Sequence, residues 1–163
     1  STVKRFLKTD CDYLLFLDGD IIPPMRLLDL IKYNADIIGA TCFAYKGDSI
    51  VPIVFKKNKQ KPLKSVINGK LTKHYGYRVH PFKDDRGVKE TDGIGTGCML
   101  IARRVLEDVK APFSNYYDDD GLRVIGLDLS FCEKASKLGS PPAGGLSPLK
   151  SGRSVPYLSI ASR

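Results

Sequence analysis

The sequence contains no apolar run long enough to cross a bilayer. A membrane-spanning helix needs about 18 to 20 consecutive apolar residues, whereas the most apolar stretch, YLLFL at 13–17, is bounded by Asp12 and Asp18. We therefore expect no membrane span. The first ten residues are partly basic and lack the apolar segment of a secretory signal, so we expect no such signal within them. There is also no initiator Met, which suggests a fragment.

Cysteine is scarce, and its spacing excludes the common zinc motifs. The four cysteines, at 11, 42, 98 and 132, form no C-x-x-C pair, and neither His lies at a zinc-ligand spacing from them. Each cysteine lies in an apolar stretch, so we expect buried, reduced thiols. Reduced thiols are typical of a cytoplasmic protein, which is the location that we predict.

The composition is that of one folded domain with an excess of positive charge. The 163 residues are 42% hydrophobic and 27% charged, which excludes a wholly disordered or collagen-like chain. The net charge of +8 favours anionic partners such as nucleic acid, phosphate-bearing molecules or an acidic membrane. Fourteen of the last 25 residues are Gly, Pro or Ser, and none is acidic. We therefore predict a core over 1–139 and a poorly ordered tail over 140–163.

The first third of the chain predicts an α/β fold. The apolar run 13–17, followed by Asp18, is typical of a strand buried on both faces near the centre of a parallel sheet. Pro23 and Pro24 then predict the start of a helix that ends near Tyr33. The stretch 36–43 predicts the second strand of a β-helix-β unit.

The remaining pattern continues this alternation. Asn68-Gly69 between alternating apolar residues predicts a β-hairpin, and the lysine-rich stretch 56–64 before it predicts an exposed loop. The pattern further predicts strands at 51–55 and 88–92, a turn at 93–97, a strand that leads into a helix over 98–109, and a helix at 127–138.

Two carboxylates follow the first predicted strand. In open α/β sheets ligands bind beyond the carboxyl ends of strands, which is where Asp18-Gly19-Asp20 would lie. Carboxylates two residues apart project the same way from extended backbone. Such a pair suits Mg²⁺ or Mn²⁺, which leaves coordination positions open for phosphate oxygens. The alternative is an ordinary turn, because Asp and Gly are common turn residues.

Three further features are candidates for chemistry. Asp128 begins a predicted helix and could serve either as a general base or as the helix N-cap. The glycine-rich stretch 93–97 could admit a substrate against the backbone or be only a bend. Asp92, directly before it, could orient a sugar hydroxyl.

The blocks DYLLFLDGDIIPPMRLLDLI, TDGIGTGCMLIARRVLEDV and GLDLSFCEKASKLG, in this order, resemble the nucleotide-sugar glycosyltransferases of the GT-A fold, close to family 2. The resemblance implies a Rossmann-like mixed sheet flanked by helices, and transfer of a sugar from a nucleotide diphosphate donor to a hydroxyl acceptor. It implies that Asp18 and Asp20 hold Mn²⁺ or Mg²⁺ and the donor, and that Asp92 also contacts the donor. The loop Gly95, Thr96 and Gly97 would lie against the acceptor, and Asp128 would be the catalytic base.

The chain also departs from this family. Leu127 stands where members carry an acidic residue, the chain begins after the first family strand, and no His follows the last predicted helix. The resemblance therefore implies an incomplete fold that is truncated at the N-terminus and has an atypical tail.

Two alternative functions fit parts of the pattern. A haloacid dehalogenase-type phosphatase also ends an apolar strand in D-x-D, with Asp18 as nucleophile and Asp20 as acid/base. A nucleic-acid-binding module could use the lysines of 56–64 with Tyr75 and Tyr77, although a solvated loop explains the lysines more simply.

Overall fold

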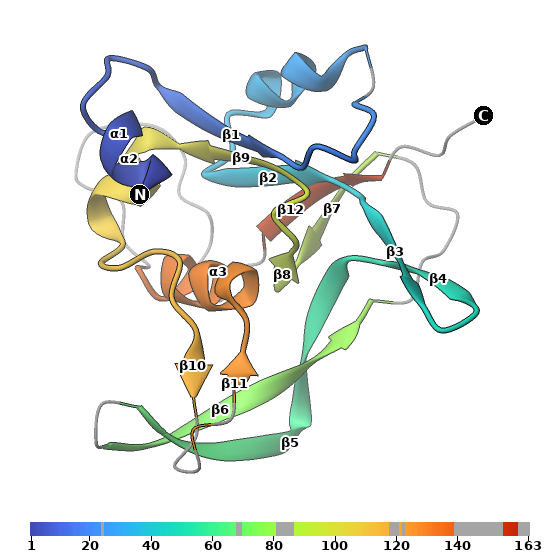
Figure 1. Ribbon diagram of the computed structural model, residues 1–163, viewed down its shortest axis with the longest axis vertical. Helices are drawn as coiled ribbons and strands as arrows, with labels where there is room; N and C mark the ends of the chain where they lie inside the picture. The colour runs from blue at the N-terminus through green and yellow to red at the C-terminus, as the bar shows by residue number, and fades with distance from the viewer. Residues whose placement is uncertain are drawn as a thin grey trace.

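The computed structural model describes residues 1–23, 25–67, 70–80, 87–117, 121, 123–138 and 155–159, with the backbone alone described for 59–67, 70–75, 124 and 155–159. The chain forms a mixed α/β fold (Figure 1). The helices are α1 (Thr2–Phe6), the 3₁₀ helix η1 (Leu27–Tyr33), α2 (Arg103–Asp108) and α3 (Leu127–Lys137). The strands are β1 (Tyr13–Leu17), β2 (Ile37–Ala40), β3 (Phe43–Lys46), β4 (Ser49–Pro52), β5 (Val54–Ile67), β6 (Lys70–Val79), β7 (Gly87–Thr91), β8 (Gly93–Ile94), β9 (Cys98–Ala102), β10 (Tyr116–Tyr117), β11 (Arg123–Ile125) and β12 (Val155–Ser159).

A five-stranded sheet in the order β1-β9-β2-β12-β7 forms the centre of the fold. All neighbours in it are antiparallel except β2 and β12, which are parallel. The general α/β class is therefore confirmed, but the expectation of a parallel sheet is wrong. Both β1 and β2 run antiparallel to β9, which lies between them. The two strands of the predicted β-helix-β unit thus point the same way without being neighbours.

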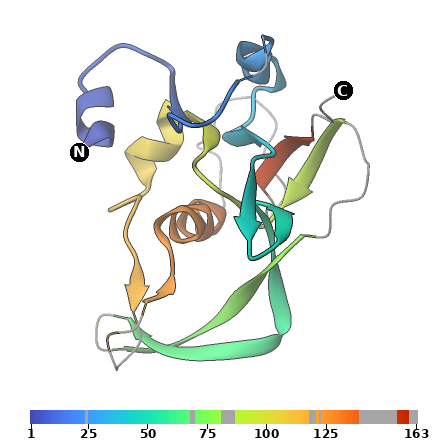
Figure 2. The ribbon, with the colours of Figure 1, turned by 45° about the vertical axis from the view of Figure 1, so that its right-hand side comes forward.

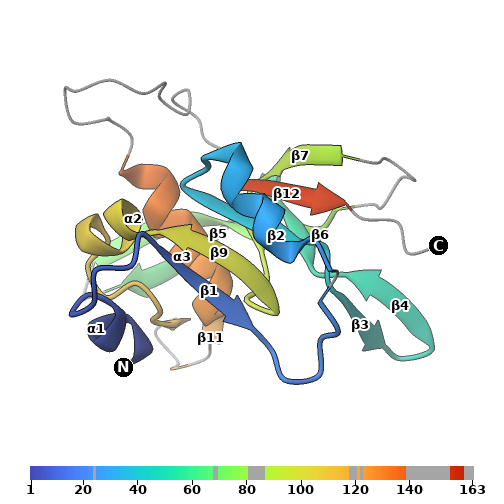
Figure 3. The same ribbon diagram turned by 90° about the horizontal axis from the view of Figure 1, so that it is seen from above.

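Strand β1 lies at one edge of the sheet, which corrects the prediction of a central position (Figure 3). The continuous apolar run has a different cause, because both faces of the strand are covered. Leu14 and Phe16 pack against one core cluster and Leu15 against the other. An edge strand between two layers needs the same apolar residues as a central one.

The helices cover both faces of the sheet. On one face, Phe131 and Cys132 of α3 pack with Met99 and Ile101 of β9. On the other, Leu30 of η1 packs against alternate residues of β9 and β2. The side-chain alternation of β9 thus serves two cores at once, and Figure 1 shows α3 and η1 on opposite sides of the sheet. No helix among the described residues is long and apolar enough to span a membrane.

The helix predicted after the proline pair ends where expected but is of the 3₁₀ type. It begins at Leu27 and ends at Tyr33, with Asn34 in the left-handed conformation as its C-cap. Asp29 forms ion pairs with Arg26 and Lys32, three residues before and after it. This spacing matches the i to i+3 repeat of a 3₁₀ turn. The strand leading into a helix over 98–109 and the helix at 127–138 are confirmed by β9, α2 and α3.

The lysine-rich segment is a strand rather than the predicted loop. Strand β5 continues through 56–64 and pairs with β6 as far as Ile67 opposite Lys70, so the hairpin prediction is confirmed for the two strands. Residues 68–69 lie outside the described residues. Four residues of β5, between Lys57 and Pro62, face a single residue of β6. This bulge lets β5 accommodate a polar insertion without ending.

Two further expectations concern the tail and the cysteines. Within the stretch predicted to be poorly ordered, Val155–Ser159 form β12 in the central sheet, between β2 and β7. All four cysteines are free thiols. Cys98 and Cys132 are buried as predicted, whereas Cys42 is half-buried and Cys11 is exposed, which corrects the prediction for Cys11.

Candidate functional site

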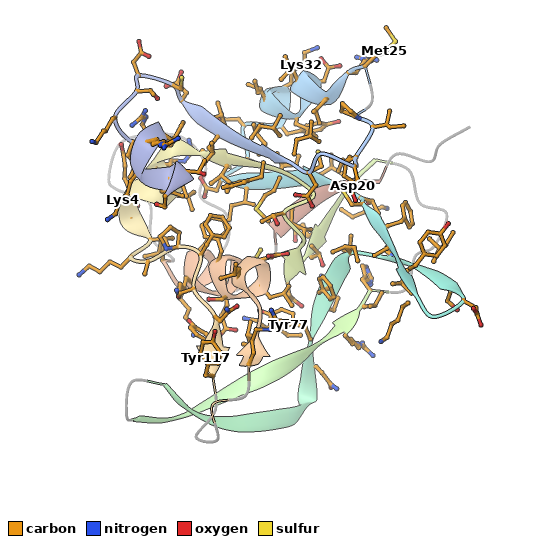
Figure 4. The ribbon with its side chains drawn as sticks, in the orientation of Figure 1. Lys4, Asp20, Met25, Lys32, Tyr77 and Tyr117 are labelled. Carbon is orange, nitrogen blue, oxygen red and sulfur yellow. The ribbon has the colours of Figure 1, made fainter. Side chains whose placement is uncertain are left out.

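Asp18 and Asp20 lie on the loop that directly follows β1. The Asp18 N–H donates to the Gly97 carbonyl over 2.9 Å, and the Asp18 carbonyl accepts from the Ile21 N–H over 3.1 Å. Both aspartates are exposed, and neither forms an ion pair with a residue in the described part of the chain. Figure 4 shows Asp20 beyond the end of β1, near the point where β2 leads into β3. The backbone is therefore held in place while the carboxylates remain available.

The loop Gly95–Gly97, between β8 and β9, lies between Asp18 and Asp128. A β-carbon added to Gly97 would lie 3.5 Å from Asp18 Oδ2, and one added to Gly95 would lie 3.7 Å from Asp128 Oδ2. The Gly95 position would also collide with the side chain of Ile53. Close approach therefore requires glycine at 95 and leaves little space for a side chain at 97, and the loop brings together residues from the three sequence blocks. We call Asp18, Asp20, Asp128 and this loop the carboxylate site.

Asp128 lies in the first turn of α3 but does not cap it. The N-cap is Gly126, and no side chain caps this end of the helix. Instead, Asp128 Oδ2 accepts from the Thr96 N–H over 3.3 Å. The carboxylate therefore points across to the glycine loop, with its other oxygen left for a further partner. The N-cap alternative does not explain this residue, and its role as a base stays a prediction.

Asp92 is engaged with the backbone of β5. Its Oδ2 accepts from the Lys57 N–H over 2.8 Å, and its own N–H donates to the Phe55 carbonyl over 3.1 Å. This arrangement ties the start of the β5–β6 hairpin to the segment between β7 and β8. Asp92 therefore has a structural role that the sequence did not reveal, and donor contact remains a prediction for it.

Cys42 is a neighbour of the carboxylate site that sequence reasoning missed. Its Sγ would lie 3.2 Å from a β-carbon on Gly97. Burial, followed by the nearby Cys98 and the negative charges of Asp18 and Asp20, raises the pKa of the Cys42 thiol to about 11. Both carboxylates thus lie close enough to this thiol to act on it electrostatically. This neighbour is recognisable only in the fold, where β1 and β2 run the same way and their carboxyl ends emerge at one edge of the sheet.

The two exposed aspartates fit a hard divalent cation only in part. Among the described residues, no group of three or more His, Cys, Asp and Glu is placed to hold a metal ion. Two carboxylates without a cationic partner are nevertheless the donor set that Mg²⁺ or Mn²⁺ uses when phosphate oxygens and water complete its shell. A β-carbon on Gly19, between them, would meet no atom within 4 Å, so there is room for a ligand at this point.

The fold is similar to that of A197 from STIV. The structural superposition with this viral protein has a TM-score of 0.51 at 17% sequence identity and covers 96% of the chain. The chain spans only 59% of the length of A197. No family model matches the chain, and no curated protein matches it either. At this identity, the likeness to A197 supports the arrangement of helices and strands and nothing about chemistry.

A surface hollow of about 380 Å³ lies at the other end of β1. It is lined by Asp12, Tyr13, Ala102, Arg103, Arg104 and Glu107. These residues carry charges of both signs, and none of them belongs to the carboxylate site. The hollow therefore offers no additional wall for a ligand held by Asp18 and Asp20.

Proposed function

We propose that the protein is, or derives from, a metal-dependent glycosyltransferase of the GT-A type. The observation that carries the proposal is the convergence of Asp18 and Asp128 on one glycine loop. Asp18 reaches this loop from the end of a strand and Asp128 from the start of a helix. One carboxylate would hold the cation and diphosphate of a donor, and the other would face the acceptor.

The chain's own residues support a division of labour in this site. Asp18 and Asp20 are exposed and carry no protein counter-charge in the described chain, so a cation bound by them would neutralise both. Such a cation, when bound, withdraws charge from a diphosphate leaving group. Asp128 is held by the Thr96 N–H through one oxygen only. Its second oxygen could accept a proton from an acceptor hydroxyl.

A thermal-shift panel of nucleoside diphosphates and nucleotide sugars, with and without Mn²⁺, tests this proposal. A ligand present at about a hundred times its Kd stabilises the folded state by about 2.7 kcal/mol. For a chain of this size we expect the Tm to rise by about 5 to 10 °C, and only with metal and nucleotide together. Asp18→Asn and Asp20→Asn should abolish the rise.

Two variants separate binding from chemistry. Asp128→Asn should keep the metal-dependent Tm rise and lose sugar transfer, because the base acts on the acceptor. Asp48→Asn is the matched control, since this exposed aspartate lies in the turn between β3 and β4, outside the site. An equal Tm rise in Asp20→Asn and the unaltered protein would remove Asp20 from the metal site. Beryllium fluoride trapped at Asp18 without a nucleotide would instead identify a phosphatase.

A further inference from the structure

The whole net charge of the protein lies in one structural element. The β5–β6 hairpin, residues 54–79, contains eight of the 26 Lys and Arg and none of the 18 Asp and Glu. The other 18 basic residues are therefore matched by the 18 acidic ones. We call this element the basic hairpin. A net charge of +8 concentrated in 26 residues creates a local positive potential rather than a general one.

The register of the hairpin places like charges opposite one another. Lys64 pairs with Lys73, and Lys56 pairs with Arg78. Directly opposed like charges on two strands destabilise a sheet. At the base of the hairpin, Lys56 Nζ donates to the Glu90 carbonyl over 2.8 Å, which relieves one pair. For the pair of Lys64 and Lys73, an external anion would provide the same relief.

Apolar positions stand ahead of these lysines at the end of the hairpin. Val66 pairs with Leu71, two residues along each strand from Lys64 and Lys73, so all four positions share one face. Two residues of a strand span about 7 Å. The outermost described pair, Ile67 with Lys70, belongs to the other face. On this face, apolar residues nearer the end of the hairpin, with lysines one step behind them, match the order of acyl chains and phosphates at a lipid surface. Tyr75, the next residue on this face, belongs to a type enriched at membrane interfaces.

A nucleic-acid surface fits the same element less well. Base stacking needs free aromatic faces on the basic strand, and Tyr77 is tied to α3. Its hydroxyl donates to Glu133 Oε2 over 3.4 Å, and Lys137 holds the other oxygen of Glu133 over 2.9 Å. Burial and the Glu133 charge raise the pKa of Tyr77 above its ordinary value. Tyr77, close to the base of the hairpin, is thus an anchor to the protein.

The far part of the hairpin extends away from the central sheet. Figures 1 and 2 both show it beyond α3, on the side of α3 opposite to the sheet. Among the hairpin residues whose side chains the structure describes, 54–58 and 76–79, only Val54 belongs to a buried core cluster. The base of the hairpin is thus joined to the core mainly at its first residue, and we expect its far part to be able to meet a flat partner.

We propose that the basic hairpin docks the protein on an anionic membrane surface, with Val66 and Leu71 at the lipid boundary and Lys64 and Lys73 at the phosphates. The proposal stands on charge and register alone and does not depend on the transferase proposal. Binding needs no nucleotide, no metal and no acceptor. It is also distinct from a membrane span, since only the end of a hairpin meets the lipid.

Co-sedimentation with vesicles tests the proposal directly. The full-length chain is mixed with vesicles of phosphatidylcholine alone, or with about 30% phosphatidylserine, at about 0.05 M and about 0.3 M salt. We expect binding to the anionic vesicles only, and weaker binding at the higher salt. In the variant Lys64→Gln/Lys73→Gln, the lipid concentration for half-binding should rise about thirtyfold, since each lysine near the surface contributes about 1 kcal/mol.

A charge-matched variant serves as the control. Lys4→Gln/Lys32→Gln removes the same charge from two exposed lysines that lie far from the hairpin (Figure 4), and its binding should change less than threefold. Equal binding to both kinds of vesicle, or equal loss in both variants, would overturn the proposal. So would tighter binding to a single-stranded oligonucleotide that also displaces the protein from vesicles. Should the hairpin variant melt early, the lipid and salt dependence of the unaltered protein decides the matter.

Discussion

At the scale of single residues, the buried thiols make stability depend on pH in the alkaline range. Cys132 is fully buried, and burial raises its pKa from the ordinary 9.0 to about 12. Above about pH 9 the unfolded chain loses this proton while the folded chain keeps it, so the folded state binds more protons. The contribution of the protonated Cys132 thiol to the free energy of unfolding is therefore complete below about pH 9 and is lost as the pH rises towards 12.

We accordingly expect the free energy of unfolding to fall by up to about 1.4 kcal/mol per pH unit from Cys132 above about pH 9. Urea unfolding from about pH 8 to about pH 11 measures this slope. Cys132→Ala should make the slope shallower and leave the part that comes from Cys42, whose pKa is also raised, and Cys11→Ala, at an exposed position, should leave the slope unchanged. Identical slopes in the Cys132 variant and the unaltered protein would show that this thiol does not carry the dependence.

The residues of the carboxylate site show what a sequence can and cannot give at this scale. Asp18 and Asp128 are recognisable because each stands at the end of a strong strand or helix pattern. Cys42 and the backbone engagement of Asp92 are not, because they depend on which segments meet across the fold. Their contacts join positions more than thirty residues apart, which no local pattern encodes.

At the scale of elements, the same limit explains two wrong predictions: the central position of β1 in the sheet and the loop at the lysine-rich part of β5. The apolar run of β1 reports that both faces are covered, and this coverage is compatible with an edge position. The lysines of 56–64 indicate an exposed segment, and a strand of a hairpin can carry that pattern as well as a loop can. The hydrophobic pattern thus leaves the kind of element open, and the strand order depends on pairings such as that of β9 with β1.

Asp92 fastens the basic hairpin to the rest of the fold. Replacing it in Asp92→Ala leaves the Lys57 N–H without its acceptor at the bulge of β5, so we expect the free energy of unfolding to fall by about 1 to 3 kcal/mol. Asp92→Asn keeps an acceptor oxygen and should cost less. Hydrogen exchange at the Lys57 amide should accelerate in the alanine variant alone. The same exchange rate in both variants would contradict this role.

At the scale of the whole molecule, charge and core occupy separate parts of the chain. Among the described residues, the core clusters come mainly from the central sheet, β8 and the helices, with Val54 as the contribution of the basic hairpin, whereas the net charge lies in that hairpin. Neither the described core clusters nor the carboxylate site uses a residue of the far part of the hairpin. We therefore expect that this part can be removed. The register offers a clean junction, because Lys57 and Tyr77 are directly paired before the bulge.

We therefore predict that replacing residues 58–76 by Asn-Gly gives a folded protein with a short hairpin. The change removes five lysines and no acidic residue, so the formal net charge falls from +8 to +3. The Tm should drop because the contact of β5 with β10 is lost. The drop should be only a few degrees, because the hydrogen bond from Tyr77 to Glu133 remains. Any metal-dependent nucleotide shift should persist while vesicle binding disappears. An unfolded product would show that the far hairpin belongs to the core, because folding would then depend on contacts made beyond the bulge.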